Sequence, residues 1–125
     1  MIVVDASAVL EILKQTENGF RLESLLADDE LHAPHLIDLE VATILRRWVI
    51  HGEMSLMQAG QALEQFLQMP LQRHAHTNLL LEVWKLRHNL TAYDASYLTL
   101  AHFLGAELVT MDDGLRKMAA RGRPR

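Results

Sequence analysis

Two short apolar runs in this chain each stop at an aspartate. Residues 2–4 lead directly to Asp5, and residues 107–111 lead to Asp112. Runs of this length that contain β-branched residues are typical of buried strands. Longer segments with helical spacing lie between them. Strands that alternate with helices predict an α/β fold with a short, mostly parallel sheet flanked by helices.

The spacing of apolar residues predicts elements along the whole chain. The clearest helix is residues 37–51, where apolar side chains recur four, seven, eight and eleven positions after the first. Ser55 and Gln58 have the spacing of a capping box, and Thr91 and Gly105 match the start and end signals of another helix. The predicted strands are residues 2–5, 30–33, 71–74 and 107–110, and the predicted helices are residues 6–14, 18–26, 37–51, 55–68, 77–88, 92–104 and 113–120, with Asn18, Asp38 and Asp113 as three further N-caps.

Composition limits the class of protein. The 125 residues are half hydrophobic, which predicts one folded domain over residues 1–125 with residues 121–125 as a flexible basic tail. The chain has no cysteine, and this excludes disulfides, thiolate zinc sites and cysteine nucleophiles. No apolar run approaches the ~18 residues of a membrane span, and the N-terminal run is too short for a signal peptide. We therefore expect a cytoplasmic protein without a membrane partner.

Four acidic residues stand at the ends of predicted elements. Asp5 and Asp112 follow strands, whereas Glu40 and Asp94 lie in the first turns of helices. The carboxyl ends of parallel strands meet at one edge of a sheet, so the two aspartates should lie close together. Buried carboxylates need a partner, and four of them together repel one another. Since Mg²⁺ and Mn²⁺ prefer oxygen ligands, a metal site suited to phosphate chemistry is predicted. The alternative for each helix-start acid is a simple interaction with the positive end of the helix.

Charge and neighbouring residues extend this prediction. The formal net charge of −4 becomes zero if a metal neutralises the four acids. Arg46 and Arg47 follow Glu40 by about two helical turns and are candidate contacts for a phosphate backbone, or else a surface pair. Ser7 and Thr110 flank two of the acids and could each hold a carboxylate oxygen or a metal-bound water. Their alternative roles are helix N-cap and ordinary strand residue, and Asp113 is a candidate outer ligand.

The histidines and tyrosines are assigned structural positions. No histidine pair has convincing zinc spacing, including His74 and His76. Tyr93 and Tyr97 are four residues apart on one helical face, which favours core packing over base stacking. Surface or interface positions are expected for His32, His35, His51, His88 and His102.

Taken in order, these motifs resemble those of PIN-domain ribonucleases, and in particular the VapC toxins of toxin–antitoxin pairs. The matching stretches are residues 2–8, 40–47, 93–98 and 108–112, which together extend over nearly the whole chain. The resemblance implies a PIN-like three-layer sandwich. It also implies an endoribonuclease in which Asp5, Glu40, Asp94 and Asp112 bind Mg²⁺ or Mn²⁺ and hydrolyse RNA phosphodiester bonds. In this arrangement Glu40 orients or deprotonates the attacking water, or is itself a ligand.

The family also predicts partners. Its members usually form homodimers and are inhibited by an antitoxin whose C-terminal segment wraps the toxin. Apolar residues in segments 20–26 and 56–67 are more numerous than one small core needs, which predicts exposed interfaces. The family's usual final strand after the last helix has no evident counterpart in the sequence, which ends in the basic tail.

Three other classes of protein are alternatives. A haloacid-dehalogenase-like phosphatase needs a second acid two residues after its strand-end aspartate, where this chain has Ser7. A receiver domain needs an acceptor aspartate after its third strand and a late lysine, and neither is evident. The remaining alternative is a catalytically inactive PIN-like scaffold that binds RNA or protein. The presence of all four acids favours the enzyme.

Overall fold

The first strand lies inside the sheet and pairs with strands from both halves of the chain. The computed structural model describes residues 1–121 and contains a four-stranded parallel sheet in the order β3-β2-β1-β4. Ile2 lies opposite Leu31 of β2 on one side and opposite Glu107 of β4 on the other. The strands are β1 (Ile2–Val4), β2 (Leu31–Pro34), β3 (Leu71–His74) and β4 (Glu107–Val109).

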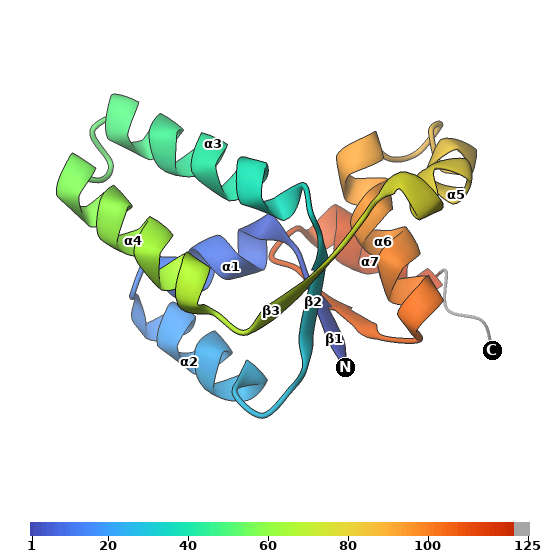
Figure 1. Cartoon of the computed structure of the whole chain (residues 1–125), viewed down its shortest axis with the longest axis horizontal. Coiled ribbons are helices and arrows are strands. Elements are labelled where there is room, and N and C mark those ends of the chain that lie inside the picture. The colour runs from blue at the N-terminus through green and yellow to red at the C-terminus, as the bar shows by residue number, and fades with distance from the viewer. Residues whose placement is uncertain (122–125) are drawn as a thin grey trace.

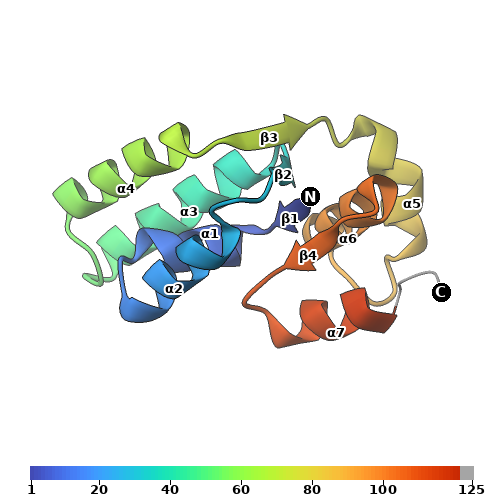
Figure 2. The same cartoon turned by 90° about the horizontal axis from the view of Figure 1, so that it is seen from below.

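Helices cover both faces of the sheet. Figures 1 and 2 place α1 to α4 on one side and α5 to α7 on the other. On the second side α6 packs against β1, β2 and β4. The predicted three-layer α/β sandwich with a parallel sheet is therefore confirmed. The helices in residues 1–121 are α1 (Ala6–Leu13), α2 (Glu17–Leu26), α3 (Ile37–Ile50), α4 (Leu56–Gln68), the 3-10 turn η1 (Thr77–Leu79), α5 (Leu80–Lys85), α6 (Ala92–Leu104) and α7 (Asp113–Arg121).

The core forms where β-branched strand residues meet the apolar helix faces. Val3 and Val4 are fully buried in β1, and Ile37, Phe66 and Tyr97 contribute large buried side chains from three helices. Two of these residues, Val3 and Val4, belong to the run that the sequence singled out as a strand. Among residues 1–121, none of the helices is both long and apolar enough to cross a membrane.

Several predicted helix ends are correct. Ser55 and Gln58 form the full capping box of α4, Thr91 accepts a hydrogen bond from the Asp94 backbone N–H, and Gly105 ends α6 in the left-handed conformation. These three ends depend on local chemistry, so the local sequence was sufficient to predict them.

Two other predicted caps are wrong. Thr16, not Asn18, caps α2 by accepting from the Gly19 N–H at 3.1 Å, while the Asn18 amide donates to Glu11. Asp38 makes no cap hydrogen bond in α3, because its carboxylate pairs with Nε of Arg73 at 2.8 Å. A long-range partner thus takes Asp38 away from the local role.

The predicted helix over residues 77–88 is shorter and starts as the 3-10 turn η1. It ends at Lys85, where the side chain of Arg87 donates to the Trp84 carbonyl at 3.0 Å and occupies an acceptor that a longer helix would use. The predicted basic tail was residues 121–125, but Arg121 is the last residue of α7, so the prediction is wrong for that residue. Residues 122–125, and with them the question of a strand after α7, lie outside the described residues.

Candidate active site

Asp5 lies where β1 ends and α1 begins, and both of its carboxylate oxygens are held. The residue is the N-cap of α1, and Oδ1 accepts from the Ala8 N–H at 3.0 Å and from the Ser7 hydroxyl at 2.6 Å. The Thr110 hydroxyl donates to Oδ2. Asp5 is almost fully buried. A buried carboxylate with this many donors is held in one orientation.

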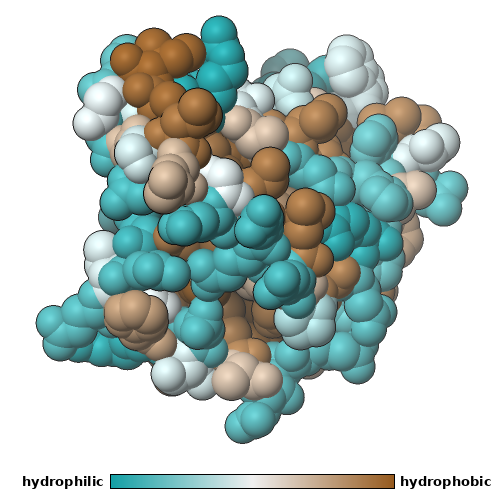
Figure 3. All heavy atoms as spheres, turned by 60° about the vertical axis from the view of Figure 1, so that its left-hand side comes forward, coloured by the Kyte–Doolittle hydropathy of each residue, from teal (hydrophilic) through white to brown (hydrophobic). Residues whose placement is uncertain are grey.

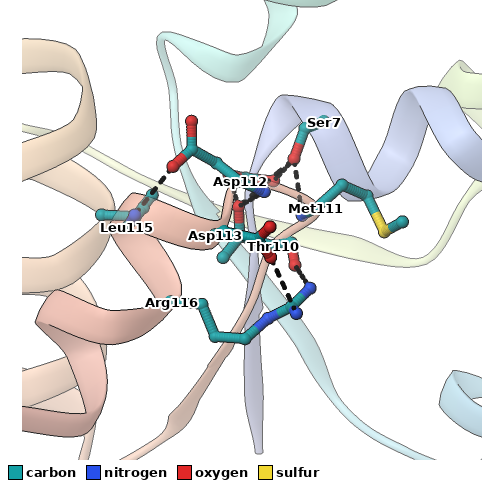
Figure 4. Close-up of polar contacts among 8 residues, drawn as sticks. Ser7, Thr110, Met111, Asp112, Asp113, Leu115 and Arg116 are labelled. Atoms are coloured by element: carbon teal, nitrogen blue, oxygen red, sulfur yellow. Dashed lines mark hydrogen bonds and ion pairs between the residues drawn. The ribbon is translucent and has the colours of Figure 1, made fainter.

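Thr110 joins the ends of β1 and β4. Its hydroxyl accepts from the Asp112 N–H at 3.0 Å while it donates to Asp5. The Ser7 hydroxyl likewise accepts from the Met111 N–H at 2.9 Å (Figure 4). Two hydroxyl side chains therefore fix the loop after β4 against the start of α1.

Asp112 opens the last helix. Its Oδ1 accepts from the Leu115 N–H at 2.7 Å, as Figure 4 shows. The predicted cap Asp113 is wrong, because its carboxylate is exposed and pairs with Arg116 at 3.2 Å instead. Arg116 also donates to the Thr110 carbonyl at 2.8 Å. Asp5 and Asp112 thus follow the same plan, in which a strand-end aspartate caps the next helix.

Glu40 reaches the same region from α3. The Tyr97 hydroxyl of α6 donates to its Oε1 at 2.5 Å. Burial raises the pKa of Glu40, the Tyr97 hydrogen bond opposes that rise, and the charges of Asp94 and Asp5 add to it. Burial and the neighbouring Glu40 also raise the pKa of Tyr97 far above its usual range, so the phenol remains a donor.

Asp94 enters from the first turn of α6. Burial raises its pKa, and the charges of Asp112 and then Asp5 raise that pKa further. The charge of Asp5 therefore repels both Glu40 and Asp94, and the charge of Asp112 also repels Asp94. The four acids come from four different elements and repel one another in the absence of a cation.

The donor chemistry fits a hydrated divalent ion. Within residues 1–121, none of the four acids takes part in an ion pair. The same part of the chain contains no group of three His, Cys, Asp or Glu side chains arranged to hold a metal ion. Mg²⁺ keeps several waters and often binds through only one or two carboxylates. The four carboxylates therefore suit an ion that keeps part of its hydration shell better than an ion that has lost all its waters.

Sequence reasoning missed several positions around this site. Tyr97 is in the core as expected, but its contact with Glu40 was not foreseen. Tyr93 was expected in the core and is 61% exposed, so that prediction is wrong. Arg46 and Arg47, both candidate phosphate contacts, lie at different places: Arg47 lines a cavity that includes Glu40, whereas Arg46 lines a different one.

His32 corrects another prediction. It was expected at the surface or an interface, but it is buried, with Nδ1 2.8 Å from Nε2 of His74 and Nε2 2.9 Å from the Glu30 carboxylate. Burial and the neighbouring His32 and His35 lower the pKa of His74. These rings lie on β2 and β3, and the strand pairing that brings them together is not visible in the local sequence. The other four histidines of that prediction are exposed: His35, His51, His88 and His102.

Comparison with known proteins decides the family. A family model described as the PIN domain matches residues 2–121. The chain belongs to the PIN-domain family. Two relatives from Mycobacterium tuberculosis are similar over most of their length. Ribonuclease VapC1 is 42% identical over 98% of this chain and 92% of the relative, and ribonuclease VapC9 is 40% identical over 90% and 86%. The predicted membership of the PIN and VapC group is confirmed.

Solved structures support the fold. The crystal structure of Mycobacterium tuberculosis VapC20, described as a sarcin-ricin loop cleaving toxin, has a TM-score of 0.72 at 17% identity and covers 99% of this chain and 97% of its own. The structure of PAE2754 from Pyrobaculum aerophilum has a TM-score of 0.68 at 24% identity and covers 96% and 87%. The PIN-like sandwich is thus shared beyond the range of clear sequence similarity.

Proposed function

We propose that this PIN-domain protein is an endoribonuclease that depends on Mg²⁺ or Mn²⁺ and acts as the toxin of a toxin–antitoxin pair. The observation that carries the proposal is the cluster of four acids, Asp5, Glu40, Asp94 and Asp112: Asp94 is repelled by Asp5 and Asp112, Glu40 is repelled by Asp5 and Asp94, and none of the four forms an ion pair within residues 1–121. The similarity to VapC ribonucleases adds the substrate class.

The four acids divide into two roles in this proposal. Asp5, Asp94 and Asp112 would hold the ion directly or through its waters. When bound, the cation makes a water more acidic and neutralises charge on the scissile phosphate. Glu40, held in place by Tyr97 and with a raised pKa, orients the attacking water or accepts its proton. Ser7 and Thr110 keep the Asp5 carboxylate fixed during the reaction.

The test is cleavage of total cellular RNA by the purified chain, free of antitoxin, in Mg²⁺, in Mn²⁺ and in EDTA. We expect cleavage with metal, none in EDTA, and none by Asp94→Asn. An inactive PIN-like scaffold that binds RNA or protein is the alternative. That reading replaces ours if wild type leaves RNA intact while Asp94→Asn is equally toxic on expression.

The antitoxin is assigned to a groove between α3 and α4. A cavity of about 390 Å³ lies there, and its walls include Leu45, Val49, Ile50, Leu56 and Leu63. Figure 3 brings this side of the molecule forward, and hydrophobic side chains gather at its upper edge. Such a groove suits the apolar face of a peptide helix, the usual form of helix-in-groove binding.

A homodimer is assigned to a different surface. Leu81 and Trp84 are three residues apart on α5 and are 82% and 66% exposed, and adjacent exposed apolar side chains often mark a protein interface. Light scattering and calorimetry with a peptide from the cognate antitoxin's C-terminal segment separate the two assignments. Leu81→Glu should yield a monomer that still binds the peptide. Leu63→Glu should remain a dimer that does not. The opposite pattern would place the dimer at the α3–α4 groove and the antitoxin on α5. If neither variant has an effect, both assignments are refuted.

A further inference from the structure

A cavity opens directly beside Glu40. Its volume is about 350 Å³, and its walls include Leu39, Glu40, Ile44, Arg47 and Tyr93. This volume falls within the range of about 300–1,000 Å³ that is typical of pockets for small organic groups. The cavity lies between α3 and the start of α6, and Glu40 belongs both to its walls and to the site of the four acids.

Tyr93 provides an aromatic wall that the fold does not use for its core. The side chain is 61% exposed, although Tyr97 one turn later is buried. Tyr93 also precedes Asp94 directly, and its backbone is fixed because the Ser96 hydroxyl donates to the Tyr93 carbonyl at 2.6 Å. Leu39, 74% exposed, adds an apolar wall on the α3 side. A ring next to a catalytic acid and open to solvent is well placed to stack against a ligand.

Arg47 provides the cation. It follows Glu40 by seven residues, which is two helical turns, and so faces the same side of α3. Arg47 has no acidic partner within the described part of the chain. An aromatic platform combined with an unpaired cation is the combination by which proteins bind single-stranded nucleic acid, through base stacking and phosphate contact.

We propose that this cavity holds one nucleobase of the substrate RNA, next to the scissile bond. The base stacks on Tyr93 against the apolar wall of Leu39, and Arg47 binds an adjacent phosphate. Tyr93 and Arg47 are then residues that select for an unpaired, accessible base, because a base inside a duplex cannot enter the cavity. This inference rests on the proposed ribonuclease function and adds the subsite that admits single-stranded RNA.

Binding to a defined probe tests the stacking contact. The probes are fluorescein-labelled single-stranded RNAs of about 12 nucleotides, one of A only and one of U only. The control probe is an abasic strand of the same length. All proteins carry Asp94→Asn so that the probe stays intact. Tyr93→Ala should weaken binding of the base-containing probes by about 5- to 150-fold and leave the abasic strand unaffected. Tyr93→Phe, which keeps the ring, should restore the affinity.

Matched controls come from the same molecule. Phe103→Ala removes another exposed aromatic residue of α6 that lines a different cavity, and should not change the affinity. Arg47→Ala should weaken binding of both probes and reduce the slope of log affinity against log salt by about one. Arg21→Ala should leave that slope unchanged, because Arg21 is an exposed arginine on α2, a helix that packs against α1.

The outcomes separate this inference from the proposed function. If the enzyme without Asp94→Asn cuts RNA and Tyr93→Ala raises KM with little change in kcat, both stand. If that enzyme cuts RNA but Tyr93→Ala binds both probes like Phe103→Ala, the subsite is refuted and the ribonuclease remains. Loss of dimerisation or of antitoxin-peptide binding in Tyr93→Ala, at unchanged RNA affinity, would assign the cavity to a protein partner and overturn the inference. If wild type cuts no RNA, both proposals fail together.

Discussion

The hydroxyl of Tyr97 donates a hydrogen bond to Oε1 of Glu40 and thereby joins α6 to α3. Burial alone would favour the protonated form of Glu40, and the phenol counteracts this by stabilising the carboxylate. One core residue therefore sets both the orientation and the acidity of the acid that we assign to the attacking water.

Tyr97→Phe should change the acidity of Glu40. Without the hydroxyl the pKa of Glu40 rises further, so the acidic limb of the pH–rate profile should move to higher pH. The loss of a buried hydrogen bond should also lower the free energy of unfolding by about 1–3 kcal/mol, as measured in urea. A pH–rate profile identical to that of wild type would show that this bond does not control the acid.

Asp94→Asn should change how stability depends on pH. The pKa values of Asp94 and Glu40 are raised from ordinary values of 3.8 and 4.5, so folding favours their protonated forms. This stabilisation is complete below those ordinary values and is lost as the pH rises through the raised values of the folded protein. In EDTA the melting temperature of wild type should therefore fall across that window towards pH 7.

The matched measurement is the difference between the two proteins, because histidine protonation affects both equally. At pH 7 Asp94→Asn should melt roughly 2–5 °C above wild type, and the gap should close in acid. A difference in melting temperature that is constant across the pH range would mean that the neighbouring acids do not destabilise the Asp94 carboxylate.

Asp5→Asn should have the opposite effect on stability. The Asp5 carboxylate accepts from Ser7, Thr110 and the Ala8 N–H, whereas an amide has only one acceptor oxygen for them. The substitution should lower the free energy of unfolding by about 1–3 kcal/mol. In a double-mutant cycle with Thr110→Val the two losses should sum to more than the loss in the double variant, since both remove the same bond. Full additivity would argue against the bond.

Added metal should stabilise wild type by mass action. A ligand at a hundred times its Kd adds about 2.7 kcal/mol to the free energy of unfolding. The melting temperature should rise with Mg²⁺ or Mn²⁺ concentration, and Asp94→Asn should remove most of the rise. An unchanged melting temperature across the millimolar range, with no heat of binding by calorimetry, would refute the metal site.

The sequence was sufficient for the frame of the site, because that frame depends on local patterns. Short β-branched runs placed Asp5 and Asp112 at strand ends, and parallel strands bring such ends together. Start signals placed Glu40 and Asp94 in first turns, where the structure has them. The catalytic roles of these four residues stay predictions until cleavage is measured.

What the sequence did not reveal depends on contacts between distant elements. The local sequence does not show that Asp38 binds Arg73 or that His32 contacts His74. Both contacts arise because β2 pairs with β3, which lies far away in the sequence. Helical spacing placed Tyr93 and Tyr97 on one face of α6, but only tertiary packing, which the local sequence does not show, leaves Tyr97 buried and Tyr93 exposed. The two neighbouring arginines likewise differ by the cavity each one lines.

The strand order has a consequence for synthesis of the protein. β1 leaves the ribosome well before its partner β4 and before Thr110 and Asp112, whose side chains complete the Asp5 end of the sheet. Because a chain grows from its N-terminus, most helices can form while one edge of β1 still waits for β4. The acidic site can therefore assemble only after β4 and the start of α7 have been made, and a growing chain cannot cut RNA before that point.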